Sequence, residues 1–275
     1  MITQFWRKLL RALWNHDPSY CDMYEDAHAR AVATEYLTPI RRHLQERFGT
    51  RPLSVLDAGC QSGRVLIPLA QAGHAMIGID ASAFALRRAR AHARTHRLTV
   101  RWIRGDIANL RRWIAPASLD AVVCTEVLYL CRNYRTVLQR FTEVLKPGGL
   151  LFVSHRPSLY YVALAVAHGH FQHADALLAQ DEGLSTDGTY HNWQTPAQLA
   201  ALYRGLHLTG IDTYPIDCSA TRLDLAPASD EVRRFLASAK TSDSLFRIPT
   251  YLLVVAQHGV REPASLPVNG RSAAH

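Results

Sequence analysis

Hydrophobic residues in the middle of the chain occur in short runs separated by segments of helical periodicity. Five apolar runs have the length expected of buried strands: residues 53–57, 75–79, 98–103, 119–124 and 150–154. The segments between them carry apolar residues three and four positions apart, which predicts helices at 62–72, 82–96 and 135–145. Alternating strands and helices are typical of a parallel sheet that is covered by helices on both faces.

Two amphipathic segments precede this region. Residues 2–14 have an apolar face with Arg7, Lys8 and Arg11 between its members, which predicts a short basic helix. Such a helix is compatible with contact with a membrane surface, with a lid over an apolar substrate, or with packing on its own domain or on a second subunit. Residues 24–47 predict a longer helix that contains Pro39.

The alternation becomes less regular after residue 154. Residues 157–180 are largely apolar and predict helix, and residues 181–191 predict a polar loop. Thr195 and Pro196 are typical of a helix start, because threonine caps a helix and proline suits its first turn. The remaining expected elements are a strand at 207–216, a helix at 229–240 and a strand at 251–257. We therefore expect N-terminal helices over residues 1–50 that act as a cap, an α/β domain over 51–258 with an insertion at about 155–193, and a disordered tail at 259–275.

Composition places the chain in a broad class. Its 275 residues are 48% hydrophobic, which suits one α/β domain with attachments. The five cysteines are scattered and include no Cys-x-x-Cys pair, so we expect reduced thiols, no metal site and a cytoplasmic protein. The longest wholly apolar stretch, Tyr160 to Ala167, is too short to span a bilayer.

The net charge of +8 raises the question of an anionic partner. Nearly all of the positive charge is arginine, and four arginines lie on the helix predicted at 82–96. This run is compatible with binding to RNA, although a solvated outer helix face explains it as well.

The stretch with the clearest chemistry follows the first predicted strand. Asp57 ends that strand, and the turn Gly59-Cys60-Gln61-Ser62-Gly63 leads into the next helix. Glycine tolerates positive φ and lets a ligand approach the bare backbone. Asp80 ends the second strand about 20 residues later, where an acid can accept hydrogen bonds from a ribose.

Further motifs follow in a fixed order. Arg104-Gly105-Asp106-Ile107 closes the third strand, Thr125-Glu126 follows the fourth, and Lys146-Pro147-Gly148-Gly149 precedes the fifth. Over residues 53–154 this arrangement resembles the class I S-adenosylmethionine-dependent methyltransferases of the small-molecule and quinone-biosynthesis type. The resemblance implies a Rossmann-like sheet of six parallel strands, with a seventh, antiparallel strand inserted between the fifth and the sixth. It also implies S-adenosylmethionine as cofactor and S-adenosylhomocysteine as product.

The resemblance also implies roles for individual residues. Gly59 and Gly63 would let the backbone approach the cofactor, Asp57 would bind its amino group, and Asp80 would bind its ribose. Asp106 and Ile107 would contact the adenine. Thr125 and Glu126 would lie near the sulfonium, although Glu126 could instead form a salt bridge. Gln61 stands where the family often has glycine, and its amide could itself bind the cofactor. The full set of expected cofactor-binding residues is Tyr24, Asp57, Gly59, Gln61, Gly63, Asp80, Ala81, Asp106, Ile107 and Thr125.

No motif identifies the methyl acceptor. The apolar insertion favours a small aromatic or lipophilic acceptor that is methylated at O, N or C, in a pocket formed with the N-terminal helices. Candidate catalytic residues are His155, Tyr129 and Glu126. Two alternatives stay open at this point, an RNA methyltransferase and a catalytically inactive S-adenosylmethionine-binding regulatory protein. The oligomeric state is not predicted.

Overall fold

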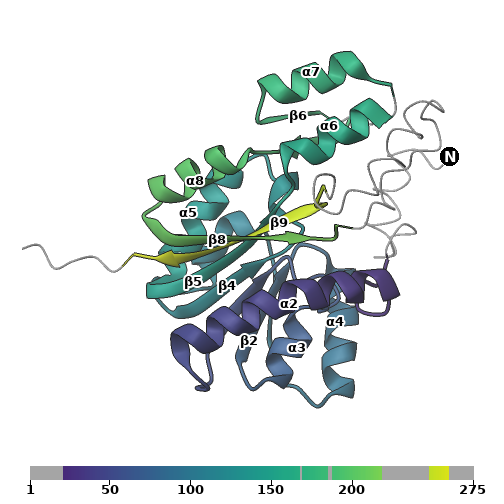
Figure 1. Ribbon diagram of the computed structural model, residues 1–275. Helices are drawn as coiled ribbons and strands as arrows, with labels where there is room; N and C mark the ends of the chain where they lie inside the picture. Colours follow the sequence, from purple (N-terminus) through teal and green to yellow (C-terminus); the bar gives the residue numbers. More distant parts are fainter. Residues whose placement is uncertain (1–20, 168, 185–187, 219–247, 260–275) are drawn as a thin grey trace, which may run out of the picture.

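A seven-stranded sheet forms the centre of the molecule (Figure 1). The computed structural model describes residues 21–167, 169–184, 188–218 and 248–259. Its strand order is β3-β2-β1-β4-β5-β9-β8, and β9 is antiparallel to both of its neighbours while the other pairs are parallel. The predicted antiparallel strand between the fifth and sixth strands is therefore confirmed. The strands are β1 (Ser54–Ala58), β2 (Ala75–Asp80), β3 (Arg101–Arg104), β4 (Leu119–Cys124), β5 (Leu145–His155), β8 (Leu208–Ile216) and β9 (Tyr251–His258).

Helices cover both faces of this sheet, as Figure 1 shows. Strand side chains alternate between the faces, so that Val55 packs with one group of helices and Leu56 with the other. The first group is α2 (Ala27–Phe48), α3 (Leu66–Gln71) and α4 (Ala83–Thr95). The second group is the 3-10 helix η1 (Ile107–Arg112), α5 (Tyr134–Val144) and α8 (Pro196–Gly205).

The helix starts follow the capping residues in the sequence. The side chains of Asp26 and Ser82 accept hydrogen bonds from the first turns of α2 and α4. Thr195 and Gln198 form a reciprocal capping box at the start of α8. The first helix after β1 begins at Leu66 rather than near residue 62, because residues 59–65 form a turn in which the amide of Gly63 donates to the carbonyl of Cys60 at 2.8 Å.

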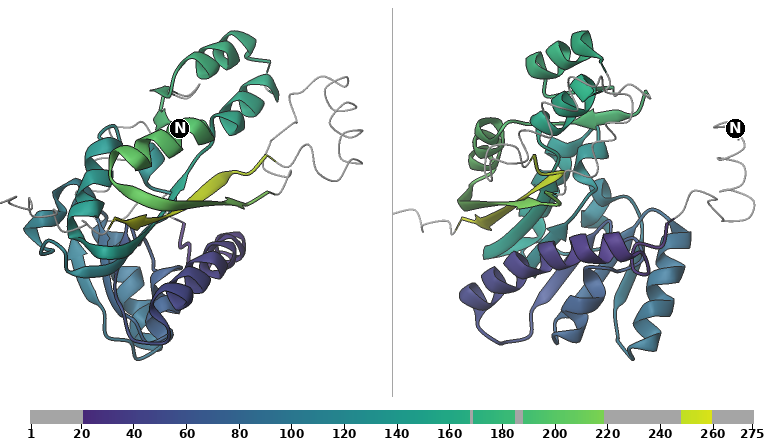
Figure 2. Two further views of the ribbon diagram at one scale, coloured as in Figure 1. Left: turned by 60° about the vertical axis from the view of Figure 1, so that its left-hand side comes forward. Right: turned by 45° about the vertical axis from the view of Figure 1, so that its right-hand side comes forward.

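The insertion after β5 forms a separate layer with a small core of its own. It consists of α6 (Ser158–Ala167), α7 (Phe171–Ala179), and a hairpin of β6 (Glu182–Leu184) and β7 (Tyr190–Asn192). Residues 181–191 are thus not only a loop, since two short antiparallel strands lie within or overlap that range. Figure 2 shows from two further sides that α6 and α7 project beyond the sheet. Tyr161, Leu177 and Trp193 are buried at the centre of this layer.

Three predicted segments lie outside the described residues: the helix at 2–14, the helix at 229–240 and the tail at 259–275, of which only Gly259 is described. Among the helices that the structure does describe, none combines the length and the apolar character needed to cross a bilayer. The short 3-10 helix η2 (Leu128–Leu130) completes the elements and connects β4 to α5.

Candidate cofactor and acceptor site

A hollow opens at the carboxyl ends of the parallel strands β1, β2 and β4. Ligands of open α/β sheets bind at this edge, because the loops that follow the strands leave a crevice there. The turn after β1, the ends of β2 and β4, and the segment before α2 contribute its walls. Its lining residues are Met23, Asp57, Gly59, Cys60, Gln61, Arg64, Val65, Asp80, Thr125, Glu126 and Val127.

The glycine turn forms one wall of the hollow, and its backbone includes positive φ angles, which favour glycine. Gly59 has a φ of +82°, and a Cβ at this position would collide with Cγ2 of Val127. Gln61 also has a positive φ, +45°, which explains why the related motif often has glycine at this place. The Gln61 amide group donates to the carbonyl of Cys21 at 2.8 Å. This hydrogen bond fixes the segment before α2 to the glycine turn.

Two acids lie at the strand ends, the buried Asp57 and the partly buried Asp80. Asp80 accepts hydrogen bonds from the backbone amides of Gln61 (2.9 Å) and Ser82 (2.8 Å), and burial raises its pKa. Asp57 is 2% exposed. Burial raises the pKa of Asp57 to about 7; the nearby Arg64 lowers it, and the charge of Asp80 raises it further. Each carboxylate oxygen of Asp80 retains a lone pair for a ligand hydroxyl.

An ion pair forms the floor of the hollow. Arg64 Nη2 lies 2.7 Å from Glu126 Oε1, and the arginine side chain is 7% exposed. Glu126 has a φ of +60°, and its backbone amide donates to the hydroxyl of Ser154 at 2.6 Å. A non-glycine residue in this conformation is uncommon, and such residues are frequent in functional sites. The sequence reasoning missed Arg64, although its position directly after Gly63 places it in the same turn.

Residues 21–25, which we call the strap, lie across the glycine turn and α4. The backbone amide of Tyr24 donates to Ser62 Oγ at 3.0 Å, and Asp22 Oδ2 lies 3.0 Å from both His92 Nε2 and Arg88 Nε. Burial alone would raise the pKa of Asp22, but its hydrogen bonds, with His92 first among them, keep the pKa below the usual value. Asp22 is therefore charged at neutral pH.

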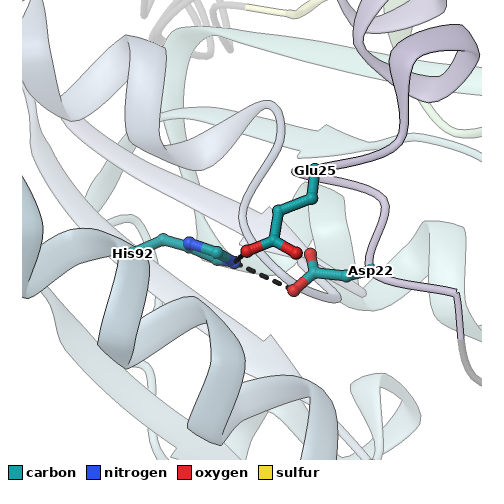
Figure 3. Close-up of side chains that lie close together, drawn as sticks. All are labelled: Asp22, Glu25 and His92. Atoms are coloured by element: carbon teal, nitrogen blue, oxygen red, sulfur yellow. Dashed lines mark hydrogen bonds and ion pairs between the residues drawn. The ribbon is translucent and has the colours of Figure 1, made fainter.

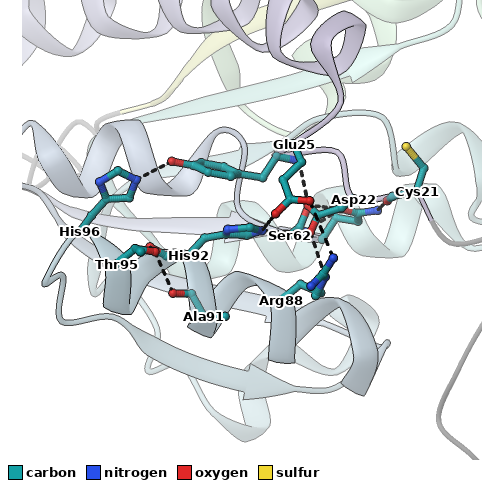
Figure 4. A network of polar contacts seen from close by, with 11 residues as sticks. Cys21, Asp22, Glu25, Ser62, Arg88, Ala91, His92, Thr95 and His96 are labelled. Atoms are coloured by element: carbon teal, nitrogen blue, oxygen red, sulfur yellow. Dashed lines mark hydrogen bonds and ion pairs between the residues drawn. The ribbon is translucent and has the colours of Figure 1, made fainter.

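Figure 3 shows Asp22, Glu25 and His92 facing one another, an arrangement of ligand types that could hold a metal ion. In the wider network of Figure 4, Arg88 approaches both acids, at 3.0 Å from Asp22 and 3.8 Å from Glu25. The guanidinium already supplies the positive charge that a cation would bring. We therefore interpret this cluster as an ion-paired attachment of the strap to α4.

Several predicted residues meet at the hollow and others do not. Asp57, Gly59, Gln61, Asp80, Thr125 and Glu126 line it. Gly63 lies beside the lining residue Arg64 in the same turn, with a φ of +94°. Ala81 and Asp106 are exposed outside the lining, and Asp106 caps η1 by accepting from Ala108 at 2.9 Å, with Ile107 buried below it.

Tyr24 and His155 point to other parts of the molecule. The Tyr24 ring stacks on His92 with centroids 4.4 Å apart, and its hydroxyl bonds His96 at 2.7 Å, whereas the neighbouring Met23 lines the hollow. His155 is fully buried, and its Nε2 lies 2.8 Å from the hydroxyl of Tyr203 on α8. Burial lowers the pKa of His155 to about 4. The structure therefore gives both side chains structural contacts.

Tyr129, the remaining catalytic candidate, is buried beside the insertion. Its ring stacks against His191 of β7, with centroids 6.0 Å apart and planes 11° from parallel. Burial raises the pKa of its hydroxyl well above the ordinary value, so the phenol stays protonated at neutral pH and the phenolate is not populated as a base. Tyr129 also contacts Arg156, a residue that the sequence reasoning did not select.

Comparisons with known proteins agree with this arrangement. A family model described as "Methyltransferase domain" matches residues 55–149. The ubiquinone biosynthesis O-methyltransferase of Xylella fastidiosa (strain M23) is 30% identical over 199 residues, which are 70% of this chain and 77% of that protein. The chain belongs to the class I S-adenosylmethionine-dependent methyltransferases. Its cofactor is S-adenosylmethionine, its product is S-adenosylhomocysteine, and its acceptor is a small molecule.

Solved structures show the same fold at lower identity. The 1,6-didemethyltoxoflavin-N1-methyltransferase of Burkholderia thailandensis is 18% identical with a TM-score of 0.57, and the match covers 92% of this chain and 90% of that one. The magnesium protoporphyrin IX methyltransferase of Synechocystis PCC 6803, solved with bound S-adenosylhomocysteine, is also 18% identical, with a TM-score of 0.56 and coverage of 92% of both chains. Neither the RNA alternative nor the inactive alternative gains support from these relatives.

Proposed function

We propose that this methyltransferase binds its cofactor in the hollow and transfers the methyl group to an O, N or C nucleophile of a small aromatic or lipophilic acceptor. The single observation that carries the proposal is a pair of acids at adjacent strand ends of one hollow, the buried Asp57 and the partly buried Asp80. Asp80 would accept from the ribose hydroxyls and Asp57 from the amino group of the cofactor. A buried carboxylate needs a partner, and the cofactor supplies donors at both places.

The glycine turn and the ion pair complete the proposed binding mode. Gly59 lets the backbone approach the cofactor, and Glu126 brings negative charge to the region of the sulfonium while Arg64 holds it in place. S-adenosylmethionine supplies an electrophilic methyl group, which an acceptor nucleophile attacks as the carbon–sulfur bond breaks. The protein's contribution is to hold donor and acceptor in line and to exclude water.

The acceptor side of the proposal rests on the insertion. Residues 155–193 follow β5 and form a layer rich in aromatic side chains, among them Tyr161 and Trp193. Asn192 of this layer donates to the carbonyl of Leu128, in η2 directly after β4. Pockets for organic molecules are mostly apolar with few polar groups. The names of the relatives, which concern ubiquinone, toxoflavin and magnesium protoporphyrin, support a ring-containing acceptor.

Calorimetric titration with S-adenosylhomocysteine tests the binding mode. Asp80→Asn should raise the dissociation constant by about tenfold or more, because hydrogen bonds to a charged acceptor each contribute about 1.5–3 kcal/mol. Asp175→Asn is the matched control, since Asp175 is an exposed acid on α7. Equal affinities for the wild-type protein and the Asp80 variant would exclude this placement of the ribose.

A further inference from the structure

Arg156 lies within a cluster of tyrosine rings at the carboxyl end of β5. Its guanidinium carbon is 4.5 Å from the ring centre of Tyr129, 4.8 Å from Tyr160, 5.0 Å from Tyr251 and 5.8 Å from Tyr161. We call these four rings the tyrosine cage. They come from η2, from α6 of the insertion and from β9, so the cage joins the insertion to the sheet. Arg156 Nη2 also donates to the Tyr251 hydroxyl at 3.0 Å.

The cage lies next to the proposed site of reaction. β4 and β5 pair in parallel with Cys124 opposite Val153, so the residues that follow each strand lie at the same edge of the sheet. Glu126, which lines the hollow, donates its backbone N–H to Ser154, two residues before Arg156. This edge is where an acceptor must approach the methyl group of a cofactor held by β1, β2 and β4.

The charge of Arg156 has no carboxylate partner among the residues that the structure describes. Every ion pair found there involves other side chains, and Arg156 Nε is a buried donor without a hydrogen-bond acceptor. Arg64 offers the contrast within the same site, because its guanidinium lies 2.7 Å from Glu126. A partly desolvated guanidinium without a counter-charge is costly, and neutral tyrosine rings compensate this cost only in part.

We propose that Arg156 binds the carboxylate of an aromatic acid, and that such an acid is the class of acceptor that this enzyme methylates. The inference rests on the proposed function, since the acid would be the methyl acceptor. A guanidinium matches a carboxylate with two parallel N–H donors, and flat tyrosine rings suit an aromatic ligand. Arg156 as a whole residue is only partly buried.

Binding of two nearly isosteric probes tests this assignment. 4-Hydroxybenzoate and 4-hydroxybenzamide differ in charge but hardly in shape, and each is titrated into the full-length protein saturated with S-adenosylhomocysteine. We expect the acid to bind the wild-type protein about ten- to a hundredfold more tightly than the amide, as one charge-assisted contact allows. Arg156→Gln should remove this preference, and Arg156→Lys should retain part of it because the charge remains while the planar fork is lost.

Arg132 provides the matched control. Its guanidinium carbon lies 4.5 Å from the ring centre of Tyr190, but the residue is exposed, so Arg132→Gln should leave the preference for the acid unchanged. Equal binding of both probes to the wild-type protein, absence of binding by the acid at millimolar concentration, or a preference that survives Arg156→Gln would each overturn the proposal.

Binding of S-adenosylhomocysteine alone separates this inference from the proposed function. A wild-type protein that binds this product but does not prefer the acid contradicts only the role of Arg156. A wild-type protein that does not bind it contradicts the placement of the cofactor in the hollow. If Arg156→Gln fails to fold, the probe preference of the wild-type protein and its change in Arg156→Lys decide the question, with product affinity as the check on folding.

Discussion

Asp57 occupies the most unusual electrostatic position in the hollow. It is almost fully buried, and desolvation raises its pKa to about 7 even though Arg64 opposes the shift. Near neutral pH the carboxyl group is therefore about half protonated in the absence of ligand. The cofactor's amino group is positively charged, and it can donate a strong, charge-assisted hydrogen bond to Asp57 only when that carboxyl group is ionised.

Cofactor affinity should therefore depend on pH through Asp57. A ligand that selects the ionised acid releases a proton below pH 7, so affinity for S-adenosylhomocysteine should rise about tenfold between pH 6 and pH 8 and then level off. Asp57→Asn has no proton to release and should show weaker binding with a flat profile over this range. Titrations in two buffers of different ionisation enthalpy measure the released proton directly. The same rise in the Asp57→Asn variant would assign the pH dependence to another group.

Residue positions were predictable where the periodicity of the chain places the side chain. Asp57, Asp80, Thr125 and Glu126 each lie at or just past a strand end, and the parallel sheet brings strand ends together. Tyr24 was not predictable, because its orientation depends on His92 of α4, which is distant in sequence.

The arginine side chains of the site show the same limit of prediction from the sequence. The sequence indicates which arginines follow a strand or a turn, but it does not show which of them receives a carboxylate partner. Arg64 has Glu126 at 2.7 Å, and no periodic pattern marks that pair. The tyrosine cage likewise depends on rings from η2, α6 and β9 meeting at one place.

At the scale of elements, the strap is the part of the cofactor wall that ion pairs hold in place. Asp22, 8% exposed, joins it to Arg88 and His92 of α4, while Met23 lines the hollow. Segments held by a few polar contacts open more readily than strands in a core. The strap should therefore open and close as a unit, and its attachment should affect cofactor affinity.

Asp22→Asn should loosen this element without unfolding the protein. We expect faster amide exchange at residues 21–25 and a dissociation constant for S-adenosylhomocysteine about three- to tenfold higher, because two contacts to a charged carboxylate are weakened. Glu25→Gln is the control, since the Glu25 side chain is 60% exposed and lies farther from both partners, at 3.8 and 4.0 Å. Exchange that increases equally in both variants would show that Asp22 has no special role.

Elements were predicted well where hydrophobic periodicity is strong, and the strands β4 and β9 have nearly their expected bounds. The predicted bounds of helices and strands were less accurate where local hydrogen bonds determine the backbone structure. Helix α3 begins at Leu66, four residues later than predicted, because the preceding residues belong to the glycine turn. The short strands β6 and β7 pair within a polar segment in which apolar and polar residues do not alternate. Neither feature has a signal in the pattern of apolar positions.

At the scale of the whole molecule, the sheet and the insertion have separate cores. The sheet core is formed by strands and helices on both faces, whereas Tyr161, Ala165, Ala174, Leu177 and Trp193 form the core of the insertion. Trp193, at the end of the insertion, is tied to the end of α7, since its Nε1 donates to the carbonyls of Leu177 (3.0 Å) and Gln180 (2.8 Å). Separate cores allow the acceptor side to loosen while the cofactor side stays folded.

Leu177→Ala tests this division of the molecule. Leu177 is 2% exposed, and removing a buried leucine side chain costs about 2–5 kcal/mol. We expect faster amide exchange in α6, α7 and the β6–β7 hairpin, unchanged exchange in β1 and β4, and unchanged affinity for S-adenosylhomocysteine. Leu178→Ala is the control, because Leu178 is the next residue and is 69% exposed. A loss of product affinity in the Leu177 variant alone would mean that the insertion and the cofactor half fold as one cooperative unit, since the damage would then have spread from the small core into the sheet.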